Sequence, residues 1–322
     1  MNTVRPLTRH WHRLAVSLGV LLSGGAAATA VTVIDDRGAP FTLASAARRI
    51  VSLSPGATEL LFAAGAGSRV VGTVEFSDYP AEASALPRIG NSATLSIEGI
   101  AALAPDLIIA WPHGAAQRQM AQLLRLKAPV FVSDPRSLAE VAIGLETFGQ
   151  LAGSSAIANP AARQYRMHMD ALRQANAGVA PVRVFLQIWN SPLMTINDRH
   201  LIADALRLCG GRNVFGDAAV LAPTVGYEAV VAANPEAIVA IAEPMAALAW
   251  LATWERWPGL DAVRYGARFA IPGQTISSPT PRMLLGTSAL CDRLEQTRRR
   301  RTKGRRRALK LAISPSQYDI LP

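Results

Sequence analysis

With 322 residues, half of them hydrophobic, the chain is long enough for two modest lobes with cores of their own, and its formal net charge is +10. Residues 1–30 hold three arginines and no acid, residues 297–322 hold nine basic residues and one acid, and the remainder has 21 basic and 22 acidic residues. The body of the protein is therefore nearly neutral, its charge gives no indication of a nucleic-acid partner, and we expect none.

The N-terminus has the order typical of a secretory signal peptide. Three arginines precede the apolar run 14–22, and small residues that end in Ala-Thr-Ala at 28–30 follow it. This order predicts cleavage after Ala30 and export to the periplasm. The apolar run is shorter than the roughly 20 residues that span a bilayer, so a membrane anchor is the weaker alternative. No later stretch resembles a transmembrane helix, and we expect the mature protein to be soluble.

Strands and helices alternate along the first half of the mature chain. A β-hairpin is predicted over residues 31–43, with its turn at Asp36-Arg37-Gly38. This alternation predicts a parallel α/β sheet. The other elements expected in this half are the strand 49–53, the helix 57–64 that Gly65 ends, the strand 70–74, the helix 97–103 and the strand 106–110.

A single amphipathic helix of roughly 20 residues interrupts the alternation at about residues 155–177, and it would span about 30 Å. It ends at Gly178, and a strand follows at 182–186. The predicted fold class is therefore α/β, with two Rossmann-like lobes joined by a long interdomain helix. The tail is a block of like charge and is expected to be disordered. The predicted segments are the signal peptide at 1–30, the N-terminal lobe at 31–150, the interdomain helix at 151–180, the C-terminal lobe at 181–296 and the basic tail at 297–322.

An internal repeat supports the division into two lobes. Residues 98–110 read EGIAALAPDLIIA, and residues 228–240 read EAVVAANPEAIVA. In each copy a glutamate opens a short helix, a proline ends it and an apolar strand follows. Glu98 and Glu228 would therefore occupy equivalent places, one in each lobe. A carboxylate in the first turn stabilises a helix by about 0.3–1 kcal/mol, which is one sufficient reason for these residues; docking on a basic partner is the other.

The chain contains two cysteines, Cys209 and Cys291. In an exported protein, two cysteines favour one disulfide, which here would close a loop of about 80 residues. The loop-entropy relation gives an upper contribution of about 4.5 kcal/mol to stability. Two buried free thiols are the alternative.

Sequence motifs for catalysis are missing. The chain contains no G-x-x-x-x-G-K-[ST], no G-x-S-x-G and no H-E-x-x-H. Its five histidines are scattered, and none pairs with another ligand type at helical spacing, so we expect no structural metal site. We predict that the protein is not an enzyme and carries no cofactor of its own.

Four aromatic residues fall at or just after the C-terminal ends of predicted strands, where open α/β sheets bind their ligands. Aromatic rings suit a large, flat, partly apolar ligand, since ring faces give contact area with little loss of entropy. Each ring could instead cap the core of its own lobe, but four together favour a binding cleft. They are Phe76, Tyr79, Trp111 and Trp189.

Several segments between about residue 50 and residue 294 carry a family resemblance, namely IVSLSPGATELLFAAG, FSDYP, IEGIAALAPDLIIAW with QRQ after it, VFLQIWNSP, LRLCGGRNVF, YEAVVAANPEAIVA and PRMLLGTSALCDRL. In their order and spacing they resemble the class III periplasmic substrate-binding proteins of ABC importers, most closely the cobalamin (vitamin B12) branch. The resemblance implies a helical-backbone binding protein with its ligand in the cleft between two lobes. It also implies a monomer that docks on a membrane permease and its ATPase.

The resemblance assigns roles to individual residues. Phe76, just before S-D-Y-P, would contact the corrin, and Trp111 would line the cleft. Glu98 and Glu228 would dock on arginines of the permease. The expected ligand contacts are Ser54, Pro55, Gly56, Ala57, Phe76, Tyr79, Trp111, Trp189, Ser277 and Ser278.

The resemblance also places the family's disulfide on Cys209 and Cys291. Three places depart from the family pattern. Ala222 and a position near Ser92 stand where the family has tryptophans, and the loop 275–280 lacks the family's acidic residue. These departures leave the fold unaffected and bear on which ligand is bound.

The predicted function is that of a periplasmic receptor that captures cobalamin or a related corrinoid for an ABC importer. A haem or ferric-siderophore receptor of the same fold is the alternative. A siderophore site needs Arg or Lys in the cleft, and the candidate loops offer mostly small and aromatic residues. A chelatase-like enzyme would need clustered metal ligands or acid–base pairs, whereas an adhesin or scaffold would need no aromatic cleft.

Overall fold

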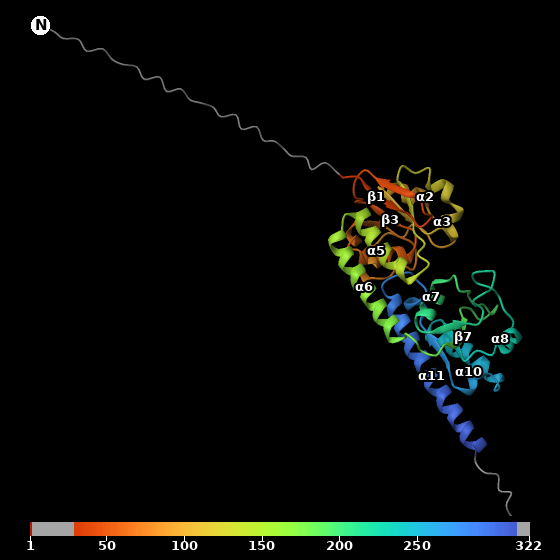
Figure 1. Cartoon of the computed structure of the whole chain (residues 1–322). Coiled ribbons are helices and arrows are strands. Elements are labelled where there is room, and N and C mark those ends of the chain that lie inside the picture. Colours follow the sequence, from red (N-terminus) through yellow and green to blue (C-terminus); the bar gives the residue numbers. More distant parts are fainter. Residues whose placement is uncertain (2–28, 314–322) are drawn as a thin grey trace, which may run out of the picture.

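The computed structural model describes Met1 and residues 29–313. Most of the expected signal peptide, residues 2–28, and the last part of the expected tail, residues 314–322, lie outside the described residues. The two lobes lie one after the other along a pair of long helices (Figure 1). Within the described ranges, no helix combines the length and the apolar character that a membrane crossing requires.

A β-hairpin begins the N-terminal lobe, as the sequence predicts. Strands β1 (Val31–Ile34) and β2 (Pro40–Leu43) pair antiparallel. Gly38 in the turn has a φ of 79°, a conformation that glycine adopts without a Cβ penalty. The carboxylate of Asp35 accepts two backbone N–H groups of the turn, each at 3.0 Å, and this closes the hairpin.

Four parallel strands form the sheet of the N-terminal lobe, in the order β4-β3-β5-β6. Every residue of β5 is buried, because helices cover both faces of the sheet, and this explains its continuous apolar run. The strands are β3 (Ile50–Ser52), β4 (Val70–Gly72), β5 (Leu107–Ala110) and β6 (Val130–Val132). The helices between them are α1 (Pro55–Ala63), η1 (Gly67–Arg69), η2 (Ala81–Ala85), α2 (Ile97–Ala102), α3 (Gly114–Arg118) and α4 (Met120–Leu123).

The sheet of the C-terminal lobe has the same arrangement, with the parallel order β8-β7-β9-β10. In both sheets the first strand lies between the second and the third, and the sequence repeat falls on α2 with β5 and on α8 with β9. The strands are β7 (Val182–Gln187), β8 (Gly211–Asn213), β9 (Ala237–Ile241) and β10 (Arg268–Ile271). The helices are α7 (Leu201–Leu208), α8 (Tyr227–Ala233), α9 (Pro244–Thr253), η3 (Trp254–Arg256), α10 (Asp261–Arg264) and η4 (Gly273–Thr275).

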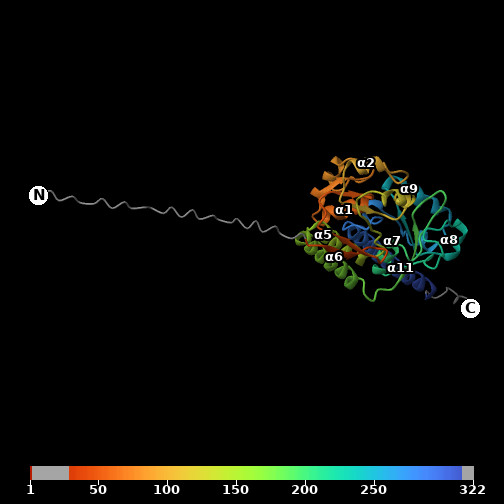
Figure 2. The same cartoon turned by 90° about the horizontal axis from the view of Figure 1, so that it is seen from above.

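Helix α6 (Ser155–Ala175) joins the lobes, and α5 (Leu138–Ala152) packs beside it (Figure 1, Figure 2). Arg166 of α6 donates to both carboxylate oxygens of Glu146 on α5, which ties the two helices together. Helix α5 is not among the elements expected from the sequence, although a serine cap and a left-handed glycine mark its two ends.

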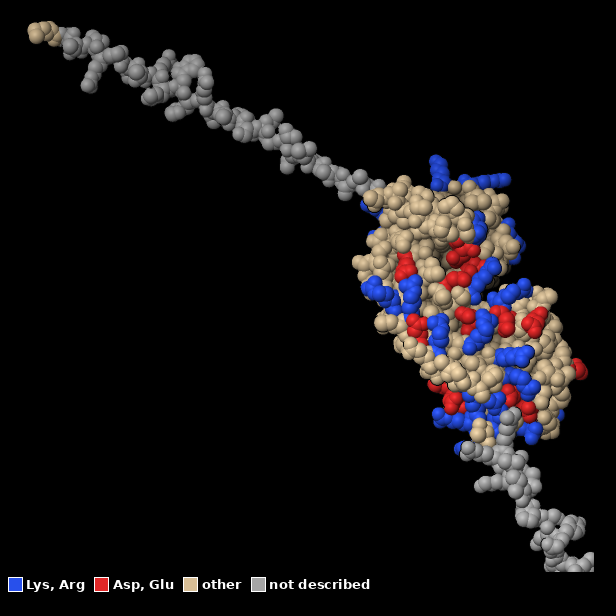
Figure 3. Space-filling model, viewed as in Figure 1, with Lys and Arg blue, Asp and Glu red and all other residues tan. Residues whose placement is uncertain are grey.

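One hydrophobic cluster extends through both lobes on the side of these helices. It includes Leu145 of α5, Tyr165 of α6 and Leu206 of α7. Smaller clusters cover the other face of each sheet and belong to one lobe only. The lobes are therefore fused along the helices and separate on the opposite side, where a notch is visible between them (Figure 3).

Helix α11 (Met283–Ile313) corrects the prediction of a disordered tail, because it continues through the basic stretch. Arg298 is only 7% exposed and donates to the carbonyl oxygen of Cys209 at 2.6 Å. Arg301 pairs with the Glu236 carboxylate at 3.0 Å. Arg298 is thus hydrogen-bonded and Arg301 ion-paired to separate groups of the C-terminal lobe, and these contacts hold the basic stretch on that lobe. Basic side chains gather at this end of the molecule (Figure 3).

The disulfide between Cys209 and Cys291 joins the end of α7 to α11, across 82 residues of sequence. It confirms the expected pairing and excludes the alternative of two free thiols. The covalent link holds the long C-terminal helix on the same lobe to which its arginines bind.

Candidate functional site

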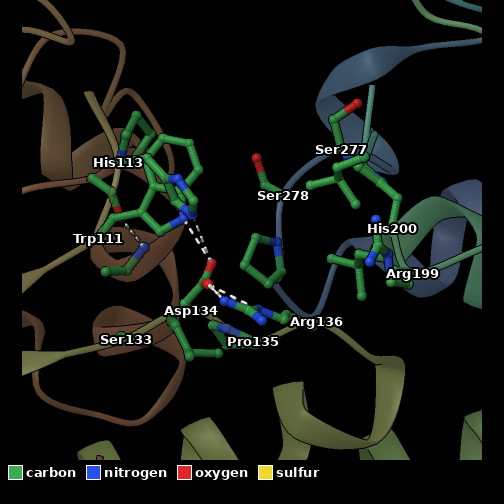
Figure 4. A pocket seen from close by; sticks show the side chains of 18 of the residues that line it. Trp111, His113, Ser133, Asp134, Pro135, Arg136, Arg199, His200, Ser277 and Ser278 are labelled. Carbon is green, nitrogen blue, oxygen red and sulfur yellow. Dashed lines mark hydrogen bonds and ion pairs between the residues drawn. The ribbon is translucent and has the colours of Figure 1, made fainter. Parts of the chain in front are cut away.

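A cleft of about 660 Å³ opens between the lobes. The N-terminal lobe contributes the start of α1 and the loops after β5 and β6, and the C-terminal lobe contributes the start of α7 and the loops before α8 and α11. Side chains of the two lobes face each other across it (Figure 4). The volume lies within the roughly 300–1,000 Å³ usual for small-molecule sites, and the strand ends of α/β sheets are where such ligands bind.

The predicted segment from Ser54 to Ala57 lies in the cleft wall, at the start of α1. Ser54 caps this helix by accepting the backbone N–H of Ala57 at 3.1 Å, and Pro55 occupies the first turn, where its missing N–H is not needed. A Cβ atom on Gly56 would stand 3.4 Å from the Pro279 side chain of the other lobe. This is an ordinary van der Waals distance, so the start of α1 lies close to the opposite wall here. The predicted Ser277 and Ser278 line the cleft next to Pro279.

Trp111 follows β5 and forms an aromatic wall of the N-terminal lobe, with 43% of its surface exposed. Its indole N–H donates to Asp134 at 3.0 Å, and its ring centroid lies 4.6 Å from that of His113. Arg136 donates to the other oxygen of Asp134 at 3.0 and 2.8 Å, and this bonding raises the pKa of Arg136. The indole is therefore held by its edge, and the rest of its ring lines the cleft.

The first hairpin supports this wall from outside the cleft. The backbone N–H of Asp134 donates to the carboxylate of Asp36. Burial raises the pKa of Asp36, and the hydrogen bond from Asp134 opposes that rise. The loop after β6 is thus fixed by a residue nearly one hundred positions earlier in the chain.

The other three predicted aromatics lie outside the cleft lining. Phe76, Tyr79 and Trp189 are 79%, 48% and 55% exposed. Phe76 has a φ of 65°, a strained conformation for a bulky residue. Trp189 packs against Trp250 with ring centroids 6.2 Å apart. Ligand contact by these three residues stays a prediction.

Tyr79 takes part in a contact between the lobes. The guanidinium of Arg282, just before α11, lies 3.9 Å from the centroid of the Tyr79 ring. Arg282 also donates to both carboxylate oxygens of Glu59 on α1, and this bonding raises the pKa of Arg282. Glu59 is buried at 3% exposure. Because the two partners belong to different lobes, this ion pair joins the cleft walls.

The C-terminal wall contains Arg199 and His200, which the sequence analysis did not select. The backbone N–H of Arg199 donates to the Asn197 side chain at 3.0 Å. His200 caps α7, since its Nδ1 accepts the backbone N–H of Ile202 at 3.1 Å. Burial lowers the pKa of His200, so the ring is neutral at neutral pH.

The signals for these missed residues differ. His113, Asp134 and Arg136 follow β5 and β6, so the strand-end rule that selected Trp111 would have found them once β6 had been assigned. Arg199 lies on a long loop after β7 that returns to the cleft, and no local pattern marks that return.

Glu98 and Glu228 occupy the same place in their lobes. Each is the second residue of its short helix, and each is exposed. Their helices α2 and α8 lie on the side of the molecule away from α6 and α11 (Figure 1). Neither carboxylate forms an ion pair within the part of the chain that the structure describes. A docking role for the pair stays a prediction.

Among residues 29–313, no group of three or more His, Cys, Asp or Glu side chains is placed to hold a metal ion. The charged residues of the cleft are two arginines and one aspartate, with two histidines beside them. The site is thus suited to bind a ligand through ring contacts and hydrogen bonds.

Comparison with known proteins adds a family and its relatives. Residues 50–275 match the family described as periplasmic binding protein. The vitamin B12-binding protein of Vibrio cholerae serotype O1 is 35% identical over 250 residues, which are 77% of this chain and 90% of that protein.

Solved structures agree with the fold. The crystal structure of the periplasmic vitamin B12 binding protein BtuF of Vibrio cholerae matches with a TM-score of 0.73 and 35% identity, over 78% of this chain and 98% of that one. The periplasmic heme-binding protein RhuT from Roseiflexus sp. RS-1 matches with a TM-score of 0.69 and 23% identity, over 78% and 99% of the two chains. The second likeness concerns the fold alone, and the two-lobed α/β fold class predicted from the sequence is confirmed.

Proposed function

The chain belongs to the periplasmic binding protein family, and on that premise we propose that it captures cobalamin or a related corrinoid in the periplasm for an ABC importer. Relatives at 35% and 40% identity are named vitamin B12-binding proteins, which are binding proteins and not enzymes. The protein performs no chemistry: it takes the ligand into the cleft, docks on the membrane permease and releases the ligand there.

The observation that carries this proposal is the cleft between the lobes. One wall is formed by Trp111 with His113 against its ring, and the opposite wall offers the small residues Ser277 and Ser278. A corrin is a flat macrocycle with an apolar face and a polar, amide-bearing edge. Ring contacts on one side and hydrogen-bonding groups on the other meet both needs.

The proposal is tested by isothermal titration calorimetry on a chain that begins at Val31, the residue after the expected cleavage site. The ligands are cyanocobalamin, haemin and a ferric hydroxamate siderophore, each titrated under the same conditions. We expect one molecule of cyanocobalamin to bind per protein molecule, more tightly than either of the others. Binding of haemin or the siderophore with no binding of cyanocobalamin would contradict the proposal.

A haem or ferric-siderophore receptor remains the second candidate, because the cleft contains Arg136 and Arg199. We expected mostly small and aromatic residues in the cleft loops, which disfavours a siderophore, and the two arginines in the lining correct that expectation. Arg136 is nevertheless paired with Asp134, so a single arginine is left for an anionic ligand. A highly charged siderophore complex would need more than one such group.

The proposed partner in the membrane is the permease and ATPase complex of the importer, reached through Glu98 and Glu228. Two exposed carboxylates, at equivalent places in two lobes that share one core, are held at a fixed separation. That geometry suits two basic sites on a partner built from two similar halves. The protein would dock as a monomer and, on this proposal, would carry no resident cofactor.

A further inference from the structure

The two walls of the cleft differ in their hydrogen-bonding character. On the N-terminal wall, the Asp134 carboxylate accepts the Trp111 indole N–H through one oxygen and two Arg136 N–H groups through the other. His113 Nε2 stands 3.5 Å from the first of these oxygens. The charge of Arg136 is therefore compensated within its own wall (Figure 4).

On the C-terminal wall, the guanidinium of Arg199 has no carboxylate partner in the described part of the chain. Its side chain donates to the backbone carbonyl oxygen of Ala219, and its backbone N–H is held by the buried Asn197. These bonds fix the loop in place without neutralising the arginine. Two arginines and one aspartate line the cleft, so one positive charge is uncompensated, and it belongs to Arg199.

Neighbouring groups on this wall are donors as well. Because His200 Nδ1 accepts the Ile202 N–H, the ring hydrogen lies on Nε2, which has no protein partner among the described residues. Ser277 and Ser278 add two hydroxyl groups. No carboxylate faces the cleft from the C-terminal lobe, so this wall fits a ligand group that accepts hydrogen bonds and carries negative charge.

From this asymmetry we infer that Arg199 recognises an anionic oxygen group of the ligand, a phosphodiester or a carboxylate. The ligand then binds in one orientation, with its ring on Trp111 and its anionic group toward the start of α7. An arginine with planar donors forms charge-assisted hydrogen bonds with such groups, which are stronger than neutral ones. The inference rests on the proposed function and makes it more specific: for a corrinoid, the recognised group is the phosphodiester of the nucleotide loop.

The test compares a corrinoid that contains the nucleotide loop with one that lacks the whole loop, its phosphodiester included. Cyanocobalamin contains the phosphodiester, and dicyanocobinamide keeps the corrin but lacks it. Calorimetry on Arg199→Gln should show about tenfold or greater loss of cyanocobalamin affinity, in line with the usual strength of a hydrogen bond to a charged group. Its affinity for dicyanocobinamide should stay within about twofold of the wild-type value, because the ring contacts are unchanged.

Two further variants serve as controls. Arg118→Gln removes another arginine whose side chain donates only to backbone carbonyl oxygens and which lies outside the cleft lining, and it should bind both corrinoids as the wild type does. Arg199→Lys keeps the charge and should restore part of the cyanocobalamin affinity. Raising the salt concentration should weaken cyanocobalamin binding in the wild type more than in Arg199→Gln.

The other possible results distinguish a failure of the inference from a failure of the proposed function. Equal losses for both corrinoids, or no loss for either, would overturn the inference, since Arg199 would then shape the cleft or take no part in binding. A wild type that binds haemin and not corrinoids would overturn the proposed function. In that case, a selective loss of haemin affinity in Arg199→Gln would still support the inference, because haem carries carboxylates that Arg199 could recognise. A wild type that binds none of these ligands would contradict both.

Discussion

Trp111 keeps its ring on the cleft because its indole N–H is already bound by Asp134, while Arg136 neutralises that aspartate. The ring position is therefore set before any ligand arrives, and little entropy is lost when a ligand packs on it.

Trp111→Ala should weaken cyanocobalamin binding about tenfold, because ring contacts contribute about 0.5–1.5 kcal/mol beyond the area they bury. Trp111→Phe keeps a ring and should retain most of the affinity. Leu124→Ala removes an exposed apolar side chain outside the cleft lining and serves as the control. Calorimetry measures all three; wild-type affinity in Trp111→Ala would show that the ring is not a ligand contact.

A second prediction follows from the pKa of His200, which burial lowers from its ordinary value of 6.5. As the pH falls below about 6.5, the unfolded ring takes up a proton and the folded ring does not, so the stability gained from the neutral ring is lost toward acid pH. His200→Asn keeps a capping side chain and removes the titration, so its unfolding free energy should depend less on pH between about 6.5 and 5.

Chemical denaturation at several pH values measures this effect. His168→Asn, the same substitution at an exposed histidine of α6, is measured alongside as the matched variant. An unaltered pH slope in His200→Asn would contradict the account of the buried neutral ring.

Residues of the site were predictable from sequence where a local rule places them. Trp111 follows a strand directly, and the strand-end rule predicted it at the cleft. The segment from Ser54 to Ala57 also follows a strand and lines the cleft, but it was the family resemblance that pointed to it. Arg199 could not be found in this way, because the path of its loop depends on Asn197 and on backbone groups near Ala219. Tyr79 follows a strand as well, yet Arg282 from the other lobe lies over its ring, and no local pattern predicts that contact.

Among the elements, α11 departs most from expectation. Its basic stretch is ordered by groups distant in sequence: Arg298 binds carbonyl oxygens at the end of α7, and Arg301 binds Glu236 just before β9. Burial works against the charged form of Glu236, but its hydrogen bonds from Arg183 and Arg301 lower its pKa overall. A run of like charges predicts disorder when only the sequence is known. The groups that bind these arginines come together only in the folded lobe.

A truncation tests this role of α11. Ending the chain after Gln296 removes both Arg298 and Arg301 and leaves Glu236 buried without Arg301, at a cost of about 3 kcal/mol. The melting temperature should fall by roughly 5–10 °C. A chain that ends after Lys303 keeps both arginines and should melt within about 2 °C of the full mature protein. Equal melting temperatures for the two truncated chains would show that the arginines contribute nothing to stability.

The other helices and strands could be predicted wherever residues within the element itself mark its start, its end or its type. The repeat placed β5 and β9 in equivalent positions, because a proline followed by an apolar run marks both. Helix α5 carried a cap at Ser137 and a stop at Gly153 and was accessible to the same rules. The order of strands within each sheet, in contrast, is fixed by tertiary packing and was anticipated only as a class of fold.

For the whole molecule, the fused helical side determines how the lobes can act. A single core runs through α5, α6 and both sheets, and the Glu59–Arg282 ion pair joins the walls on the cleft side. Hinge motion between the lobes would disturb both contacts. We therefore expect the separation between the two exposed glutamates to change little when a ligand binds.

A docking prediction follows from that constancy. Glu98→Ala combined with Glu228→Ala should abolish most of the association with the importer complex, because both lobes lose their contact at once. Glu82→Ala combined with Glu243→Ala removes from each lobe one exposed glutamate that has no ion-pair partner among the described residues, and it should leave association intact. Co-purification with detergent-solubilised permease and ATPase measures this; undiminished association of the first double variant would rule out the docking role.

The natural ligand provides the most direct measurement of the central claim, that this two-lobed receptor carries a corrinoid. The protein is purified from the periplasm of its native host grown with cobalamin, and its visible absorption spectrum is recorded before and after denaturation. The account predicts corrinoid bands that correspond to about one ligand per cleft. A haem or ferric-siderophore spectrum in their place would contradict it.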